Sequence, residues 1–82
     1  MTRLTMYSTP WCGYCHRLKR QLEREGIRFD VVDIVQHPET AAIVERANNG
    51  NQTVPTLVFD DGTTLTNPSV AQVHEQLAKL HA

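Results

Sequence analysis

The chain begins with a short alternation of polar and apolar positions, RLTMYS, at residues 3–8. Successive side chains of a strand point to opposite faces, so Leu4 and Met6 would share one face. Pro10 follows, and proline has no amide hydrogen to donate to a sheet. The pattern predicts a first strand that ends before Pro10.

The apolar spacing then changes to three and four residues. Cys15, Leu18 and Leu22 would share one face of a helix. Charged side chains occupy the opposite face: Arg17, Lys19, Arg20, Glu23 and Arg24. Glycine is favoured just after the end of a helix. We therefore expect a helix that begins at Cys12 and ends before Gly26.

The stretch IRFDVVDIV, residues 27–35, is rich in β-branched side chains and short enough for a strand. Its run of Val31, Val32 and Ile34 predicts burial on both faces. Two strands joined by a helix form a βαβ unit, in which the strands are parallel. A second helix should open at Pro38, where proline is tolerated, and end at the NGN of residues 49–51.

The last third of the chain predicts a hairpin and a helix. Two short apolar runs flank Asp61-Gly62 in TVPTLVFDDGTTLT, which indicates two antiparallel strands. Ser69, with Gln72 three residues later, has the pattern of a capping box at a helix start. Four apolar side chains are spaced to form the core stripe of that helix: Val70, Val73, Leu77 and Leu80.

Together these elements predict an α/β fold of the order β-α-β-α-β-β-α, with a four-stranded mixed sheet flanked by three helices. At 82 residues, the chain is expected to be one domain, residues 1–82. Its formal charge of -1 gives no electrostatic case for nucleic acid or an anionic membrane. The first residues lack the apolar core of a signal peptide, and no apolar run approaches the ~20 residues that span a bilayer. We therefore expect a cytoplasmic protein.

Candidate chemistry is concentrated in TPWCGYCHR, which holds the only two cysteines, Cys12 and Cys15. Cys-x-x-Cys-His is the attachment signature of a c-type haem, whereas Cys-x-x-Cys near a βαβ unit indicates a dithiol redox site. A haem needs a second axial ligand, and no candidate is compelling among Met1, Met6, His37, His74 and His81. A structural disulfide, or half of a metal or iron–sulfur site completed by His16 or a second chain, are further alternatives. The four predicted strands and the absent export signal favour the dithiol.

Dithiol chemistry follows from the placement of the two cysteines. Cys12 lies where a loop ends and a helix begins, and the helix dipole there stabilises an anion. That position lowers the pKa of a thiol, and the thiolate is the attacking species. Residues i and i+3 of a helix lie about 5 Å apart at Cα, within the range that a disulfide needs. We expect Cys12 to attack and Cys15, one turn inside the apolar face, to resolve.

The motifs YSTPWCGYC, TVPT and DDGTTLTNPS resemble the glutaredoxin-like branch of the thioredoxin superfamily along essentially the whole chain. The resemblance implies a cis Val54–Pro55 peptide bond against the disulfide, which would present the Val54 backbone to an extended thiol substrate. Gly13 would let the backbone turn closely beside the sulfur. The expected substrate-binding residues are Trp11, Gly13, Tyr14, Thr53, Val54, Pro55, Thr66 and Asn67.

Two departures from this resemblance concern charge. Glutathione-using glutaredoxins carry a lysine where this chain has Thr9, and Gly-Gly followed by Asp where it has Thr66-Asn67-Pro68-Ser69. The lysine and the aspartate hold charged ends of glutathione, so an uncharged thiol is expected here. WCGYC with TVPT and LTNPS is most similar to the mycoredoxins, whose thiol is the neutral mycothiol. The resemblance implies mycothiol as co-substrate, mycothiolated proteins as substrates, no bound cofactor or metal, and a monomer.

The mycoredoxin resemblance implies that Cys12 attacks the protein–mycothiol mixed disulfide and takes up the mycothiol. A second mycothiol then releases it, and a flavin-dependent mycothiol disulfide reductase regenerates the pool. The alternative is a thioredoxin-like redoxin that uses both cysteines to reduce protein disulfides, such as that of ribonucleotide reductase, with electrons from a flavin reductase. Such redoxins typically have a Ser-Gly-Phe-like segment in place of TNPS. His16 is expected to be a surface residue of the first helical turn.

Overall fold

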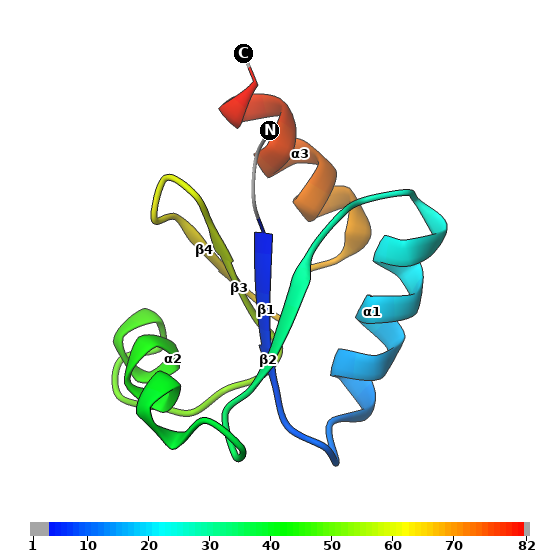
Figure 1. Ribbon diagram of the computed structural model, residues 1–82. Helices are drawn as coiled ribbons and strands as arrows, with labels where there is room; N and C mark the ends of the chain where they lie inside the picture. The colour runs from blue at the N-terminus through cyan, green and yellow to red at the C-terminus, as the bar shows by residue number, and fades with distance from the viewer. Residues whose placement is uncertain (1–3, 82) are drawn as a thin grey trace.

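A mixed sheet of four strands forms the centre of the computed structural model, which describes residues 4–81 (Figure 1). The strands lie in the order β2-β1-β3-β4, with bounds β1 (Leu4–Ser8), β2 (Asp30–Asp33), β3 (Thr56–Phe59) and β4 (Thr64–Thr66). β1 is parallel to β2 and antiparallel to β3, and β3 is antiparallel to β4. The predicted mixed sheet and element order are confirmed. Arg3, which the pattern placed in the first strand, lies outside the described residues.

Three α-helices within residues 4–81 cover the two faces of the sheet. α1 (Gly13–Arg24) and α3 (Val70–Leu80) pack on one face, and α2 (Ala41–Ala47) lies on the other (Figure 1). A short 3-10 helix, η1 (Pro38–Thr40), leads into α2. The helical segment therefore opens at Pro38 as expected, but its first turn is tighter than an α-helix. None of the described helices is long and apolar enough to cross a membrane.

The alternation of side chains along β1 contributes to two separate cores. Leu4 and Met6 lie in the α1/α3 core, whose buried members are Leu4, Met6, Cys12, Cys15, Leu18, Leu22, Leu57, Phe59 and Val73. Tyr7, next along the same strand, lies in the α2 core with Ile34 and Val44. Because neighbouring side chains of a strand face opposite sides, one strand helps to build both cores.

The second strand differs from its prediction. β2 spans Asp30–Asp33, a shorter range than the predicted residues 27–35, and it lies at the edge of the sheet. Val31 is 43% exposed, so the predicted burial on both faces is wrong. An edge strand has a neighbour on one side only, which leaves part of its surface open. The β-branched run instead delivers one buried side chain, Ile34, to the α2 core.

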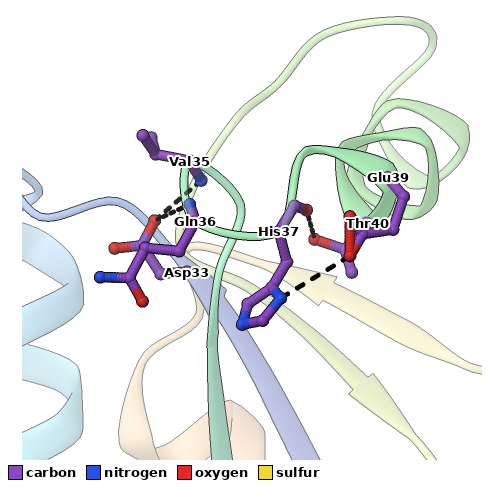
Figure 2. Close-up of polar contacts among 6 residues, drawn as sticks. All are labelled: Asp33, Val35, Gln36, His37, Glu39 and Thr40. Carbon is purple, nitrogen blue, oxygen red and sulfur yellow. Dashed lines mark hydrogen bonds and ion pairs between the residues drawn. The ribbon is translucent and has the colours of Figure 1, made fainter.

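Asp33 ends β2 and redirects the chain. Its carboxylate accepts hydrogen bonds from the amides of Val35 at 2.8 Å and Gln36 at 3.3 Å, as in an Asx turn (Figure 2). The carbonyl of His37 then accepts a hydrogen bond from the Thr40 hydroxyl at 2.6 Å, at the start of η1. These local hydrogen bonds carry the chain from the edge of the sheet to α2.

The predicted turns and caps are present. The Ser69 hydroxyl and the Gln72 side chain form the capping box at the start of α3. Gly26 follows the end of α1 with φ +71°, and Gly62 has φ +88° in the hairpin between β3 and β4. Both conformations are easily adopted by glycine, which lacks a Cβ. Within the predicted core stripe of α3, Val73 is fully buried, and the others pack against the core partly buried: Val70, Leu77 and Leu80.

Candidate functional site

Cys12 and Cys15 form a disulfide at the start of α1, with their Cα atoms 5.2 Å apart. This distance agrees with the separation expected for two residues one helical turn apart. Cys12 is the residue that caps α1, and its backbone is extended, so the loop after β1 ends at the sulfur. Both cysteines belong to the α1/α3 core.

The Cys12 sulfur accepts a hydrogen bond from the amide of Cys15 at 3.1 Å. An amide aimed at the sulfur, together with the positive end of the helix dipole, stabilises negative charge on that atom. The same bond satisfies one of the amides that a helix start leaves without a backbone partner. The geometry therefore favours a thiolate at Cys12 when the disulfide is reduced.

The two cysteines occupy different positions in α1, but their exposed fractions are similar. Cys12 is 8% exposed and Cys15 is 3% exposed, so the expected order is present but the difference is small. Exposed aromatic side chains lie beside each of them in sequence, with Trp11 at 75% and Tyr14 at 66% exposure. Large exposed aromatic surfaces next to a sulfur provide contact area for a docking molecule.

The structure suggests a different reason for glycine at position 13 from the one expected. Gly13 lies in the first turn of α1, and it is not among the glycines with positive φ. A Cβ built at Gly13 would meet no other described atom within 4 Å. The backbone conformation therefore does not itself require glycine here, and the missing Cβ leaves open space beside Cys12.

The Val54–Pro55 bond is cis, as the resemblance implied. Val54 packs against both the α1/α3 core and the α2 core, and the former contains the two cysteines. The amide of Asn67 donates a hydrogen bond to the carbonyl of Pro55 at 2.8 Å. The structure thereby joins two segments that lie far apart in the chain, residues 53–55 and residues 66–67.

Asn48, at the end of α2, is a residue that the sequence did not single out. Its amide nitrogen donates to the carbonyl of Val44 at 2.8 Å and to the hydroxyl of Thr56 at 3.0 Å. Its amide oxygen accepts a hydrogen bond from the Thr66 hydroxyl. The Thr56 hydroxyl in turn donates to the carbonyl of Thr53 at 2.7 Å. One side chain thus links α2 to both segments that carry expected substrate-binding residues.

Two hollows open beside the disulfide loop, each bordered by one of the exposed aromatic residues. The hollow beside Tyr14 has a volume of about 300 Å³ and continues to Asn67 and the start of α3. The hollow beside Trp11 has a volume of about 370 Å³ and is bordered by Thr9, Gln52 and Val54. Among the described residues that line the two hollows, Arg17 beside Tyr14 is the only charged one.

Thr9 is a buried polar residue of the hollow beside Trp11. It is 7% exposed, and its hydroxyl has no hydrogen-bond partner among the described residues. A buried hydroxyl without a partner costs free energy. None of the described residues that line the hollow beside Trp11 is charged.

His16 is exposed on the first turn of α1, as expected. Its Nε2 atom lies 3.2 Å from the carbonyl oxygen of Pro10. A carbonyl only accepts, so this nitrogen carries the hydrogen and donates it. This hydrogen bond joins the first turn of α1 to the loop that precedes Cys12.

The residues considered as haem or metal ligands have other surroundings. Met6 is 1% exposed in the α1/α3 core, and the Nε2 atom of His74 lies 2.7 Å from a carboxylate oxygen of Glu25. Met1 lies outside the described residues. Within residues 4–81, no group of three or more His, Cys, Asp or Glu side chains is placed to hold a metal ion.

A disulfide between Cys-x-x-Cys residues at a helix start, in a four-stranded mixed sheet with three helices, defines a thiol–disulfide oxidoreductase of the thioredoxin-like fold. Residues 4–63 match the glutaredoxin family, and the chain belongs to it. This match confirms the dithiol interpretation, and the strand order of the sheet confirms the predicted fold class.

The relatives extend over nearly the full length of the chain. A Mycobacterium tuberculosis protein named as a glutaredoxin is 51% identical over 77 residues, which cover 94% of this chain and 92% of that one. Mycoredoxin 1 of Corynebacterium glutamicum is 40% identical over 82 residues, which cover 100% of this chain and 98% of that one. The crystal structure of a glutaredoxin from Archaeoglobus fulgidus matches with a TM-score of 0.74 at 24% identity, covering 92% of this chain and 85% of that one, and shows the fold.

Proposed function

We propose that this protein reduces protein–mycothiol mixed disulfides, with Cys12 as the nucleophile and the cytosol as its compartment. The observation that carries the proposal is the Cys12 sulfur at the start of α1, which accepts a hydrogen bond from the Cys15 amide at 3.1 Å. Trp11 and Tyr14, the neighbours of the two cysteines in sequence, each border a hollow, and Arg17 is the only charged one among the described residues that line the two hollows. The similarity to mycoredoxin 1 along the whole chain supports the same substrate class.

The reaction begins with attack of the Cys12 thiolate on the mycothiol sulfur of the mixed disulfide. A Cys12–mycothiol disulfide forms, the bond to the client protein breaks, and the client leaves as a thiolate that takes a proton from water. A second mycothiol thiolate then attacks the mycothiol sulfur bound to Cys12. This step forms mycothiol disulfide and returns Cys12 to its thiolate form, so no electron is lost or gained overall.

The hollows provide the argument for a neutral thiol. A ligand with charged ends needs opposite charges or several hydrogen bonds to replace its lost hydration. Gln52 in the hollow beside Trp11 and Asn67 in the hollow beside Tyr14 have exposed amide side chains that offer hydrogen bonds without charge. The hydroxyl groups of a pseudo-disaccharide match such a lining.

A second candidate function is the direct reduction of protein disulfides. Cys15 lies close enough to Cys12 for the two to form a disulfide, and this supports a resolving role. In that reaction the Cys15 thiolate attacks the Cys12 sulfur of a mixed disulfide, the client thiolate leaves, and the Cys12–Cys15 disulfide remains for a reductase to reduce.

The test uses one cysteine peptide prepared in two forms, as a mixed disulfide with mycothiol and as a mixed disulfide with glutathione. We expect the reduced protein to react about tenfold faster with the mycothiol form, the factor that one or two additional hydrogen bonds provide. Cys15→Ser should keep this turnover with mycothiol as reductant, because the second mycothiol replaces Cys15. Cys12→Ser should have none.

Equal rates with the two peptides would show that mycothiol is not the specific thiol. A faster reaction with the glutathione form would assign glutathione as the preferred thiol instead. Loss of turnover in Cys15→Ser, with the wild-type protein active, would favour the direct reduction of protein disulfides. Mass spectrometry of the Cys12–mycothiol adduct in Cys15→Ser provides an independent check, since the adduct should accumulate when free mycothiol is withheld.

A further inference from the structure

Positive charge is concentrated on α1. Five of the eight Lys and Arg residues fall between residues 17 and 28, whereas residues 29–82 contain two basic and seven acidic residues. Arg17, Arg20 and Arg24 follow one another at spacings of three and four, which places them in a row along the helix. We call these three side chains the basic face.

The arginines of the basic face form no ion pair within residues 4–81. Arg17, Arg20 and Arg24 are exposed, and none of their side chains forms a hydrogen bond or ion pair with residues 4–81. Other side chains do have partners: Lys79 pairs with Glu75 at 3.6 Å in α3, and the Nδ1 atom of His37 lies 3.6 Å from a carboxylate oxygen of Glu39 (Figure 2). Three neighbouring unpaired arginines create a positive potential that attracts an external anion.

The basic face begins beside the reactive sulfur. Gly13, which directly follows Cys12, lines a groove of about 470 Å³ with the three arginines, His16 and Gln21. Arg17 also borders the hollow beside Tyr14. At a rise of ~1.5 Å per residue, the row from Arg17 to Arg24 is about 10 Å long, roughly the span of three extended residues. A chain segment attached to a cysteine at Cys12 could therefore lie along it.

The charge distribution selects among possible anions. A long polyanion or an anionic membrane would also meet the acidic remainder of the chain, and the net charge is -1. A short acidic peptide segment can contact the row alone. Arginine also suits carboxylates, because its planar guanidinium donates two parallel hydrogen bonds to them.

We propose that the basic face binds an acidic segment that flanks the reactive cysteine of a client protein. The inference rests on the proposed function only in requiring that a client disulfide be brought to Cys12. Binding here would speed the encounter with acidic clients and leave the exchange chemistry at the sulfur unchanged.

The experiment compares three cysteine peptides that differ only in their flanking residues, which are glutamate, serine or lysine. Each peptide is prepared both as a mycothiol and as a glutathione mixed disulfide, and the second-order rate with reduced protein is measured at about 0.01 M and about 1 M salt. At low salt the glutamate peptide should react about tenfold faster than the serine peptide, and the lysine peptide slower than both. At high salt the three rates should converge, because the Debye screening length falls to about 3 Å.

The double variant Arg20→Glu/Arg24→Glu should remove the preference for the glutamate peptide at low salt. Arg46→Glu is the matched control: Arg46 is exposed on α2, across the sheet, and a single reversal there should keep the preference. The single variant Arg20→Glu changes the net charge by the same amount as Arg46→Glu. Unlike Arg46→Glu, it should lower the preference for the glutamate peptide, by less than the double variant does.

Equal rates for the glutamate and serine peptides, or an equal effect of Arg46→Glu and Arg20→Glu, would overturn the inference. A preference for the glutamate flank in both the mycothiol and glutathione series would support it even where the thiol comparison failed. The outcome for the flanking charge is thus separate from the outcome for the thiol.

Discussion

The two faces of the sheet are held together by different interactions. On one face, the α1/α3 core contains nine buried side chains among the described residues, including both cysteines. On the other, the α2 core contains three, namely Tyr7, Ile34 and Val44. The α2 side adds a chain of side-chain hydrogen bonds from Asn48 to Thr56 and Thr66.

The two kinds of interaction are expected to have different effects on the molecule. Apolar packing is non-directional and close, so it fixes the reactive sulfurs by excluding alternative arrangements of α1. Hydrogen bonds are directional, so the Asn48 network sets the positions of two loop segments relative to each other. The first face should therefore determine stability, and the second should determine both stability and substrate affinity.

The largest effect is expected for Leu22→Ala in the α1/α3 core. Leu22 is 0% exposed, and removing a fully buried leucine side chain costs about 2–5 kcal/mol in the free energy of unfolding. Urea denaturation measures the loss. At a temperature where the variant is folded, its KM for a small mixed disulfide should match that of the wild type.

Leu22→Met is the control for this prediction, because a swap that nearly conserves volume costs less than about 1.5 kcal/mol. A raised KM in folded Leu22→Ala would mean that the α1/α3 core also shapes the binding segments. The division between the two faces would then fail.

A smaller loss of stability is expected for Asn48→Ala, together with a change in kinetics. The Thr56 hydroxyl, in a residue that is 0% exposed, would lose the donor that Asn48 provides, which costs about 1–3 kcal/mol. The segments at residues 53–55 and 66–67 would lose their common anchor. Steady-state assays should show KM for the mixed disulfide raised severalfold, with the reduction potential of the Cys12–Cys15 pair unchanged.

Asn51→Ala provides the comparison for Asn48→Ala. Asn51 lies on the exposed loop after α2 and donates one side-chain hydrogen bond to the Asn48 carbonyl. Its replacement should leave KM near the wild-type value. If both variants raised KM equally, the loop as a whole would be responsible, and the specific network would not.

The smallest effect is expected at Asp61, in the turn between β3 and β4, which belongs to neither core. The pKa of Asp61 is lowered from its ordinary value because the hydroxyl and then the amide of Thr63 donate hydrogen bonds to its carboxylate. A lowered native pKa means that the unfolded chain binds the proton more tightly. The contribution of Asp61 to stability is therefore complete above its ordinary value, near pH 4, and is lost as the pH falls through the native value.

Asp61→Asn removes the titrating group and keeps the size of the side chain. The wild type should be slightly more stable than this variant at pH 7, and the difference should shrink as the pH falls below about 4. Thermal unfolding at a series of pH values measures it. A difference that grows on acidification would contradict the assignment.

Several elements could be predicted because their signals are local. The capping box at Ser69, the glycine after α1 and the Asp61-Gly62 turn each depend on a few neighbouring residues. The two cysteines were identified by spacing, since residues one turn apart in a helix can form a disulfide. Burial of β2 was predicted wrongly because a β-branched run does not report whether a strand has one neighbour or two.

The sequence by itself determined the order of the elements and the position of Cys12 at a helix start. Only the tertiary structure decided that Asn48 connects Thr56 with Thr66, and that Asn67 reaches the carbonyl of Pro55. The physical reason is range. Periodicity and capping act within about one or two turns of chain, whereas these hydrogen bonds exist only after the sheet has brought distant segments together.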